Sequence, residues 1–535
     1  MLQTFSSDWI AQQIGDTQSP VANDQTSRAD ASLADLTPLA KAASVLGDKI
    51  DPALLATILN MDPAQLQPLL NEWALNGGVT QANGHYRFTQ PHARLAAYAN
   101  VPPDLRQSLH ARAADTLSLR SKFHSIETAE QIANHLENAA RPQAAFSWWM
   151  KAADYARQEE QPSLAAGFLK RAIAVSAANP SRIAPEAELS ALKILGPLLA
   201  QSKGSGSDDV ALVYERCLEI ADGLQRTGSA ATFDVLWGLS ACILVQGRIE
   251  TATELSERLV RAAQHSGDET QVLLATRLKA LTQLLAGNID AALAEFEVVK
   301  ELSEAGDHSN LRFRYASDQR AVSRSHQAWA EAISGQTVAS ERSHKQALQF
   351  AEELRHPHTS AHVMCVLAAR AQTLDDRTAA APLANAGRTI ARLHHFPYWE
   401  AWANLILGWH DAAKGTHQAI ARIDNAIEAY QRTGAGQALP YAHLLRASVA
   451  HAAGWQDMAA ASADVGLCHT NAYGVALFKV ELLLVKAKAT SNRNAQRLIV
   501  EQAIEIARTQ GTRLFEARAL QFRDHLIATS MAFAE

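Results

Sequence analysis

Residues 274–299, LATRLKALTQLLAGNIDAALAEFEVV, show how most of this 535-residue chain is built. Apolar residues recur every three or four positions on both sides of Gly287, which is typical of two amphipathic helices joined at a glycine. The first stripe is Leu274, Leu278, Leu281 and Leu285, and the second is Ile289, Ala292, Leu293, Phe296 and Val299. The stretch therefore predicts a helical hairpin.

The same junction recurs along the chain as a glycine with an alanine four or five residues after it. The pairs are Gly247/Ala252, Gly287/Ala292, Gly454/Ala459 and the looser Gly415/Ala419. Gly247 and Gly287 lie about 40 residues apart, in the range of helical-hairpin repeats. Because one hairpin buries its stripe only against a neighbour, we expect residues 121–535 to stack into a curved superhelix.

Residues 35–120 follow a different plan, which begins with three short helices. Asp51 before Pro52 and Asp62 before Pro63 are typical of helix starts, because the carboxylate caps the helix and proline needs no partner in the first turn. The third helix is predicted to end at Asn76-Gly77-Gly78. Its predicted buried residues are Leu66, Leu69, Leu70 and Trp73.

A β-hairpin is predicted after the third helix. Val79-Thr80 and Tyr86-Arg87-Phe88 flank Asn83-Gly84, a pair typical of a tight hairpin turn. Three helices and a hairpin predict a small winged-helix domain over residues 35–120. Residues 1–34, rich in Asp, Asn, Gln, Ser and Thr beyond position 15, predict a flexible lead-in. The expected architecture is thus an all-α superhelix preceded by a winged helix.

Composition narrows the class of protein. With 47% hydrophobic but only 6% aromatic residues, the chain favours helices packed closely on helices. A net charge of −6 argues against a general binder of nucleic acid or anionic membranes, which needs a basic surface. No apolar run predicts a membrane-spanning helix. Cys217, Cys242, Cys365 and Cys468 lie far apart, so we expect buried thiols in a reducing cytoplasm.

Several runs resemble large bacterial signal-transduction NTPases of the STAND class. LAKAASVLG at 39–47, YRF at 86–88, AAY at 96–98 and LHAR at 109–112 resemble the winged-helix segment of that class. FPYWEAW at 396–402, YQRTGA at 430–435, ELLL at 481–484 and EQAIEIAR at 501–508 resemble the repeats of its cyclase-linked and ATP-binding members. The resemblance covers the chain from about residue 28 onward.

This resemblance implies a winged helix followed by a tetratricopeptide-like array. In the class, both follow a P-loop NTPase that is often joined to a class III adenylate or guanylate cyclase domain or to a LuxR-type DNA-binding domain. The start of this chain then corresponds to the end of the NTPase. Relatives often carry a histidine that is implied to sense nucleotide. Gln90 stands at that place here, with His92 two residues on, so we expect no such sensing through it.

The chemistry of those enzymes has no counterpart in this sequence. No G-x-x-x-x-G-K-[ST] signature occurs to hold phosphates, and Gly204-Ser205-Gly206-Ser207, which lacks the lysine, predicts a flexible loop between repeats. The sequence has no alternating pattern of strands and helices, so it does not predict a cyclase domain. His356-Pro357-His358 and His394-His395 lack a third ligand at metal spacing and precede repeat boundaries. We expect no enzyme activity, no cofactor and no metal.

A basic cluster supplies the candidate ligand or partner surface. It comprises Arg312, Arg314, Arg320 and Arg324, beside Phe313 and Tyr315. Arg320 and Arg324 share a helix face, because they are one turn apart. Such a cluster would hold an acidic peptide or an anionic ligand on the concave surface of the superhelix. A solvated face balanced by nearby acids is the alternative.

We therefore predict a non-catalytic interaction and regulatory scaffold of bacterial signal transduction, with a protein partner or small effector on the concave surface. One alternative is the regulatory part of a split adenylate or guanylate cyclase, paired with a separate NTPase or cyclase. The other is a winged-helix transcription regulator. Against it, residues 64–76 contain no Lys or Arg, although Gln65, Gln67 and Asn71 remain candidate base readers. We expect no nucleic-acid partner.

Overall fold

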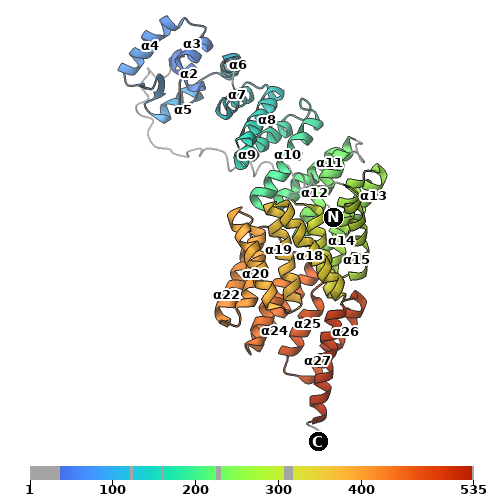
Figure 1. Cartoon of the computed structure of the whole chain (residues 1–535). Helices are drawn as coiled ribbons and strands as arrows, with labels where there is room; N and C mark the ends of the chain where they lie inside the picture. The colour runs from blue at the N-terminus through green and yellow to red at the C-terminus, as the bar shows by residue number, and fades with distance from the viewer. Residues whose placement is uncertain (1–36, 121–124, 160, 225–229, 307–316, 533–535) are drawn as a thin grey trace. The chain divides into compact units, whose positions relative to one another are not determined.

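A computed structural model of the chain describes residues 37–120, 125–159, 161–224, 230–306 and 317–532 (Figure 1). The chain divides into two compact units, unit 1 (Met1–Leu198) and unit 2 (Leu199–Glu535). The structure is 81% helical, with 25 helices in the described ranges, which confirms the predicted all-α solenoid class. The boundaries predicted near residues 34 and 120 stay predictions, and the lead-in at 1–34 lies outside the described residues.

Unit 1 begins with three short helices and a two-stranded antiparallel hairpin. These elements and the two helices after them are α2 (Pro38–Val45), α3 (Pro52–Leu59), α4 (Pro63–Leu75), β1 (Val79–Ala82), β2 (His85–Phe88), α5 (Pro91–Ala99) and α6 (Pro103–Arg120). The helices that follow are α7 (Ile126–Asn138), α8 (Pro142–Gln158) and α9 (Pro162–Ala178). Helix α10 (Pro185–Lys203) runs across the division between the units.

Capping residues set the starts of the first three helices. The side chains of Thr37, Asp51 and Asp62 each accept hydrogen bonds from backbone N–H groups of the first turn, and a proline follows each of them. Since these bonds satisfy donors that the helix leaves open, a cap of this kind stabilises a helix by about 1 kcal/mol. The starts predicted at Asp51 and Asp62 are confirmed.

The predicted hairpin is also confirmed. Strands β1 and β2 pair Val79 with Phe88, and the turn residues Asn83 and Gly84 both have positive φ, at 51° and 77°. The prediction for Leu69 is wrong, because α4 turns only its Leu66, Leu70 and Trp73 side to the core and leaves Leu69 41% exposed. The assignment of this region as a winged helix remains a prediction.

Unit 2 is an array of helical hairpins. Their first helices are α12 (Ala230–Gln246), α14 (Glu269–Ala286), α17 (Gln319–Ile333), α19 (Pro357–Thr373), α21 (Pro397–Asp411), α23 (Leu439–Ala452) and α25 (Lys479–Ala489). Their second helices are α13 (Ile249–Ser266), α15 (Ile289–Ala305), α18 (Thr337–Leu354), α20 (Arg377–Leu393), α22 (Thr416–Gln431), α24 (Gln456–Tyr473) and α26 (Arg493–Gln510). Helix α11 (Asp208–Gly223) precedes the array and α27 (Arg513–Ala532) ends it.

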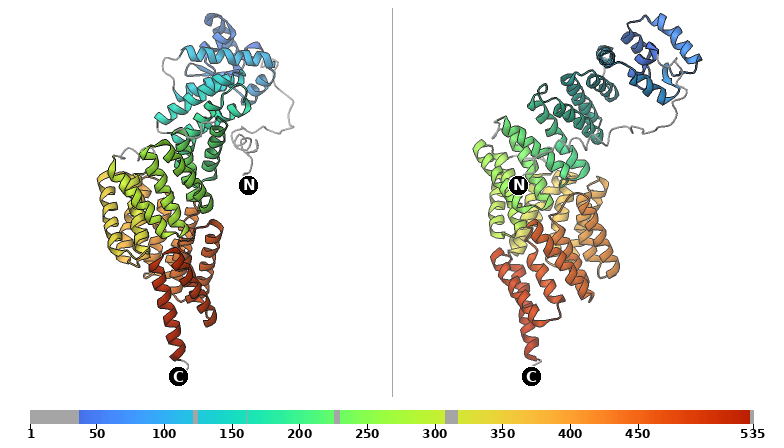
Figure 2. Two further views of the ribbon diagram at one scale, coloured as in Figure 1. Left: turned by 90° about the vertical axis from the view of Figure 1, so that its right-hand side faces the viewer. Right: turned by 180° about the vertical axis from the view of Figure 1, so that it is seen from behind.

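The first helices form a continuous inner layer in unit 2. Each contacts the first helix of the next hairpin, from α12 through α14, α17, α19, α21 and α23 to α25, and α27 follows them. The hairpins succeed one another from green to red in Figure 2. Gly247, Gly287 and Gly454 adopt left-handed φ values of 84°, 86° and 80°, as their predicted place at the turn between two helices requires.

The array closes on itself along a seam between hairpins far apart in sequence. The carbonyl of Val245 accepts hydrogen bonds from the N–H groups of Gly436 and Gln437 at 2.9 and 3.2 Å. One repeat later, the carbonyl of Leu285 accepts the same pair of bonds from Ala476 and Leu477, at 2.9 and 3.2 Å. We call these contacts, with those of Gly204 and Gly206 described next, the closing seam.

Glycines bring the backbones of the closing seam together. A Cβ atom on Gly434 would lie 2.4 Å from the carbonyl oxygen of Gly206, and one on Gly436 would lie 2.2 Å from that of Gln246. Residues 204–207 form the predicted loop, between α10 and α11, but the predicted flexibility is wrong. These residues are a tight contact, since Gly204 and Gly206 meet the backbone of Thr433 and Gly434.

Closure buries the middle of the inner layer. Every residue of α17 except Arg320 is buried. The buried residues include seven with polar or charged side chains: Gln319, Ser323, Arg324, Ser325, His326, Gln327 and Glu331. The cap residues Asp318 and Ser334 are buried as well. Helix α27 adds to this cover, because Phe515 is 1% exposed and Arg518 donates to the carbonyl of Thr373 at 2.6 Å. The middle of the inner layer of unit 2 is thus polar as well as enclosed.

The burial of the cysteines agrees only in part with the prediction from the sequence. Cys217, Cys242 and Cys365 are free and buried as predicted, whereas Cys468 is exposed. In the described part of the chain, every helix falls short of the length and apolarity needed to cross a membrane.

Candidate functional site

The predicted basic cluster does not form one surface among the described residues. Arg312 and Arg314 lie outside them. The Arg320 guanidinium lies 4.1 Å from the centre of the Phe350 ring on α18, and Arg320 is half-buried. Arg324 is only 4% exposed and points toward α15. Arg320 and Arg324 are only one helical turn apart. Because α17 lies inside the array, Arg324 is nevertheless enclosed whereas Arg320 is partly exposed.

Arg324 belongs to a polar network between α17 and α15. It donates to Gln327 at 2.8 Å and pairs with Glu304 at 3.5 Å. Gln327 in turn donates to Glu297 and Glu331. Burial raises the pKa of Glu331 above its ordinary value, and it lowers the pKa of Arg324. Arg324, Gln327 and Glu297 are paired within the network, whereas Oε2 of Glu331 is enclosed without a hydrogen-bond partner.

A second polar group lies where α14, α17, α19 and α21 meet. Arg277 on α14, His326 on α17 and His362 on α19 are 8%, 7% and 8% exposed. The rings of His326 and His362 are 5.2 Å apart, edge to face, and His362 lies 4.2 Å from the ring of Trp399 on α21. We call Arg277, His326 and His362 the inner cationic cluster.

Arginine and burial together keep these histidines neutral. Burial, and then the charge of Arg277, lower the pKa of His326 to about 3. Burial, His326 and Arg277 lower the pKa of His362 well below its ordinary value. Burial also lowers the pKa of Arg277 to about 10, which still leaves it charged at neutral pH. The cluster therefore carries one positive charge.

Sequence reasoning missed Arg277. It is a cation inside the apolar stripe of α14, next to Leu273, Leu274 and Leu278, which are at most 2% exposed. A charged residue at a core position is the signal that would have found it, because arginine is almost never fully buried unless paired. The arginines of the predicted basic cluster were selected because several cations lie close together in the sequence. Such clustering does not indicate whether a side chain is buried.

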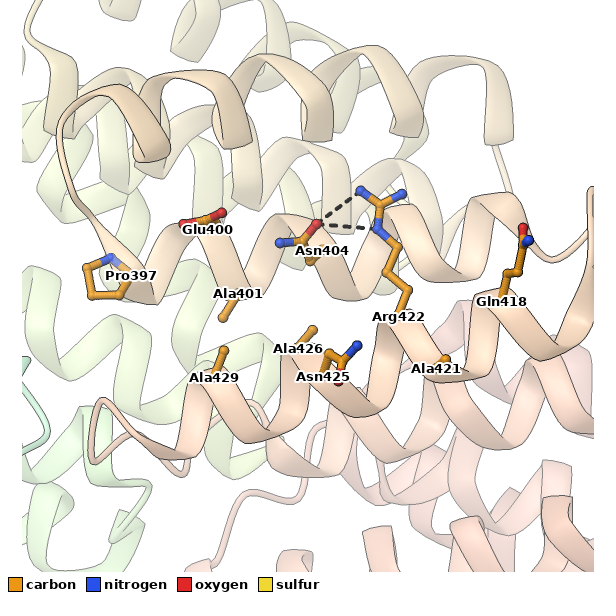
Figure 3. Close-up of a pocket in the computed structure, with 10 residues that line it drawn as sticks. All are labelled: Pro397, Glu400, Ala401, Asn404, Gln418, Ala421, Arg422, Asn425, Ala426 and Ala429. Carbon is orange, nitrogen blue, oxygen red and sulfur yellow. Dashed lines mark hydrogen bonds between the residues drawn. The ribbon is translucent and has the colours of Figure 1, made fainter.

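Between α21 and α22 lies an open groove of about 590 Å³ (Figure 3). Alanines and the amides of Asn404, Gln418 and Asn425 line it, with Glu400 at one end. Arg422 crosses the groove and donates to Asn404 at 3.0 Å and to Asp411 at 2.7 Å. Gln418 and Asn425 bring their amides to the groove from α22.

Unit 1 contains Gln90, which stands where relatives carry a histidine implied to sense nucleotide, and it also contains the candidate base readers. Gln90 and His92 are both exposed at the start of α5, and Gln90 makes no side-chain capping bond. Gln67 donates to Asn71 at 2.9 Å and to the hydroxyl of Tyr86 at 2.8 Å. Two of the three candidate readers are thus held by the hairpin.

A buried histidine pair joins α6 to α7 within unit 1. The Nδ1 atoms of His110 and His135 are 2.8 Å apart, so one of them donates to the other. The hydroxyl of Tyr98 lies 3.0 Å from Nε2 of His110. Burial, His135 and Arg106 lower the pKa of His110 to about 3, and burial lowers that of His135 to about 4. Both rings are neutral at pH 7.

The remaining histidines flagged in the sequence lie at helix boundaries, as predicted. His356 caps the start of α19, and His394 caps the end of α20. His358 accepts from Trp399 at 3.3 Å and bonds to Ser317 at 2.8 Å. Within the described ranges, no three His, Cys, Asp or Glu side chains come together as metal ligands.

The fold defines an α-solenoid protein built from helical hairpins. No protein-family model matches the chain. A protein of Rhizobium meliloti (strain 1021), known only as uncharacterized, is 22% identical over 504 residues, which is 90% of this chain and 48% of that protein. The chain thus spans about half the length of this relative.

Two solved structures are similar to parts of the chain. A STAND protein with a tetratricopeptide repeat sensor from Pyrococcus horikoshii shares 11% identity over 81% of this chain and 66% of its own, with a TM-score of 0.34. A Rap protein complexed with Competence and Sporulation Factor shares 13% identity over 64% of this chain and 99% of its own, with a TM-score of 0.41. At such scores, the function of this chain has to be argued from its own geometry.

Proposed function

We propose that the chain is a non-catalytic interaction and regulatory scaffold of bacterial signal transduction, in the cytoplasm, related to the sensor part of STAND ATPases. The array of hairpins in unit 2 carries this proposal, because stacked repeats present long surfaces suited to binding a protein segment. Residues 35–120 are the proposed winged helix. It would pass a change in the array to a catalytic partner, encoded N-terminally or separately.

The groove between α21 and α22 is the proposed contact for a protein segment. Gln418 and Asn425 offer amides that pair with a peptide backbone, and the alanines between them let it approach closely. Arg320 on α17 stays a proposed contact for an acidic segment, as a half-buried cation.

A pull-down from the native lysate tests the scaffold role. The full-length chain is used as bait with and without ATP, and bound proteins are identified by mass spectrometry. Asn425→Arg fills the groove and should lose the specific partner. Gln431→Arg, an equal change at an exposed position of α22 outside the groove, should retain it. Equal capture by both variants would move the contact elsewhere, and no specific capture would contradict the role.

A split cyclase is the second candidate. Under it, the partner recovered is a separate NTPase or adenylate or guanylate cyclase, and adding the chain changes the cyclase rate. A partner that lacks both domains would exclude this candidate and leave the general scaffold role.

A transcription regulator is the third candidate, and α4 argues against it. Gln67 and Asn71 are engaged with Tyr86, and α4 carries no basic residue for the phosphates. An electrophoretic shift with genomic DNA fragments at low salt tests this. A DNA binder would show affinity that falls steeply with added salt, and we expect no shift.

A further inference from the structure

Aromatic side chains fill the centre of the inner layer. The ring of Trp329 on α17 lies 6.5 Å from that of Trp402 on α21, and 6.0 and 5.7 Å from those of Tyr441 and Phe478. All four side chains are buried. Because such a core is closely packed, a segment of another protein cannot enter it without displacing these rings. A bound segment therefore lies against side chains that face solvent.

The groove between α21 and α22 supplies such side chains. Ala401 and Ala426 form its buried floor, and Gln418, Ala421 and Asn425 are exposed along it. Figure 3 shows the two helices facing each other across this space. Because alanine ends at Cβ, the backbone of a bound segment can come close to the floor.

The polar side chains of α22 are spaced to follow an extended chain. Gln418, Arg422 and Asn425 succeed one another at about one helical turn, or about 5.4 Å. In an extended segment, every second residue recurs at about 6.6 Å. Successive polar groups of the groove thus meet alternate residues of a segment that runs along α22.

Arg422 lies in the middle of the groove and retains donors for a ligand. Its Nε and Nη2 atoms donate to Oδ1 of Asn404 at 3.3 and 3.0 Å, and its Nη1 donates to Asp411 at 2.7 Å. A guanidinium has more N–H groups than these bonds use. The side chain is 26% exposed, so it also reaches solvent. In Figure 3 the amide nitrogen of Asn404 points away from Arg422, toward Glu400.

The charged groups at the groove leave a positive excess. Asp411 is shared between Arg422 at 2.7 Å and Lys414 at 3.0 Å, whereas Glu400 pairs with Arg392 at 3.6 Å. These ion pairs join three cations to two carboxylates, and the unmatched charge lies at the Asp411 end. Lys414 is 71% exposed there. A segment that brings a carboxylate to this end complements the charge.

We propose that the groove binds an extended acidic segment of a partner protein. A carboxylate of the segment pairs with Arg422 and Lys414, and its backbone carbonyls accept from the amides of Asn404 and Asn425. This inference rests on the proposed scaffold role, because it names the chemical class of the segment that the scaffold binds.

A random heptapeptide library displayed on phage tests the class of segment, with the full-length chain as bait at low salt. Selected peptides are sequenced, and one is synthesised with a fluorescent label so that anisotropy gives its Kd. We expect peptides rich in Asp and Glu. Their affinity should fall as NaCl is added, because salt screens charges that solvent reaches.

Reversing the charge of Arg422 should reverse the selection. Arg422→Glu should raise the Kd of the acidic peptide at least about tenfold and should select peptides rich in Lys and Arg. Arg432→Glu, the same change at the exposed end of α22 outside the groove, should alter the Kd less than about twofold. Thermal unfolding checks that each variant folds. If Arg422→Glu does not, Lys414→Glu replaces it, because Lys414 is largely exposed.

A second pair of variants locates the bound peptide. Gln418→Trp fills one end of the groove and should abolish binding, whereas Gln431→Trp, at an exposed position of α22 outside the groove, should not. Equal binding by both variants would overturn the assignment to the groove.

The acidic class is overturned if the wild type selects no peptide, if it selects peptides without Asp or Glu, or if the charge reversal leaves the Kd unchanged. The pull-down distinguishes these failures from failure of the scaffold role. A partner that Asn425→Arg loses, together with peptides that are not acidic, would leave the scaffold role and remove only the acidic class.

Discussion

Thr373, the last residue of α19, connects this helix to α17 and to α27. Its hydroxyl accepts a hydrogen bond from Nε1 of Trp329 on α17 at 2.9 Å, and its carbonyl accepts one from Arg518 on α27. Trp329 is 2% exposed and Thr373 is 5% exposed. Water therefore has little access to replace a lost bond here.

Thr373→Val should destabilise unit 2. Valine keeps the shape but removes the acceptor, so the indole N–H of Trp329 is left buried without a partner, at a cost of about 1–3 kcal/mol. Urea denaturation measures the change in the free energy of unfolding. Thr389→Val, at an exposed position of α20, is the control and should change it by less than about 0.5 kcal/mol. Equal effects would refute the role of Thr373.

The pair His110 and His135 makes stability depend on pH. The folded state holds both rings neutral down to pKa values of about 3 and about 4, whereas an unfolded histidine binds a proton near pH 6.5. Between these values the unfolded chain binds more protons. The stability contributed by the neutral pair is therefore complete above about pH 6.5 and is lost as pH falls toward 4.

His135→Phe should flatten this dependence. The shift of His135 to about 4 corresponds to about 3 kcal/mol of stability lost on acidification. Comparing the free energies of unfolding of wild type and variant at pH 7.5 and 4.5 measures it, since the buried histidines outside this pair cancel in the difference. His92→Phe, at an exposed position, should leave the wild-type slope unchanged. The same slope in His135→Phe would count against the pair.

At the scale of helices and turns, the sequence predicted what is local. Asp51, Asp62, Asn83-Gly84 and the junction glycines act on backbone within a few residues, so their patterns are sufficient. Burial of Arg324, exposure of Leu69 and the contact of Gly206 with Gly434 depend on elements far away in sequence. Periodicity gives which side chains share a face of a helix, but not which neighbour covers that face.

Gly436→Ala should open the closing seam. The added Cβ would meet the carbonyl oxygen of Gln246 at 2.2 Å, so the backbones must separate and the bonds to Val245 weaken, at about 1–3 kcal/mol. Hydrogen exchange of peptides covering residues 243–248 and 434–440 should become faster. Gly415→Ala is the control, because the nearest atom to its added Cβ is 3.9 Å away. Unchanged exchange in Gly436→Ala would show that the contact is not needed for closure.

At the scale of the whole molecule, α27 should protect the inner layer of unit 2. It contacts α17 and α25, with Phe515 and Ala519 buried and Arg518 paired with Glu481 at 3.2 Å. Deleting residues 512–535 should lower the Tm and speed hydrogen exchange in α17. Ile527→Asp, at a position 43% exposed, should do neither. Slow exchange in α17 of the shortened chain would show that the other hairpins alone enclose it.

The sequence was sufficient to predict the helical-repeat class of unit 2, but it was not sufficient to predict the candidate site. A 40-residue spacing of junctions is enough to predict stacked hairpins, because each must bury one stripe. The inner cationic cluster takes one residue each from α14, α17 and α19. No short motif joins these residues, since the curvature of the array alone brings them together.

The closing seam also limits how this chain can change in length. The Val245 and Leu285 carbonyls each meet the loop that lies the same number of hairpins further on. In an open array, a hairpin can be duplicated or lost at the cost of one interface, because only neighbours interact. Here, inserting or deleting one hairpin between them would put every later loop out of register with its carbonyl. The number of repeats inside the closed turn is therefore fixed, while additions are tolerated only outside it.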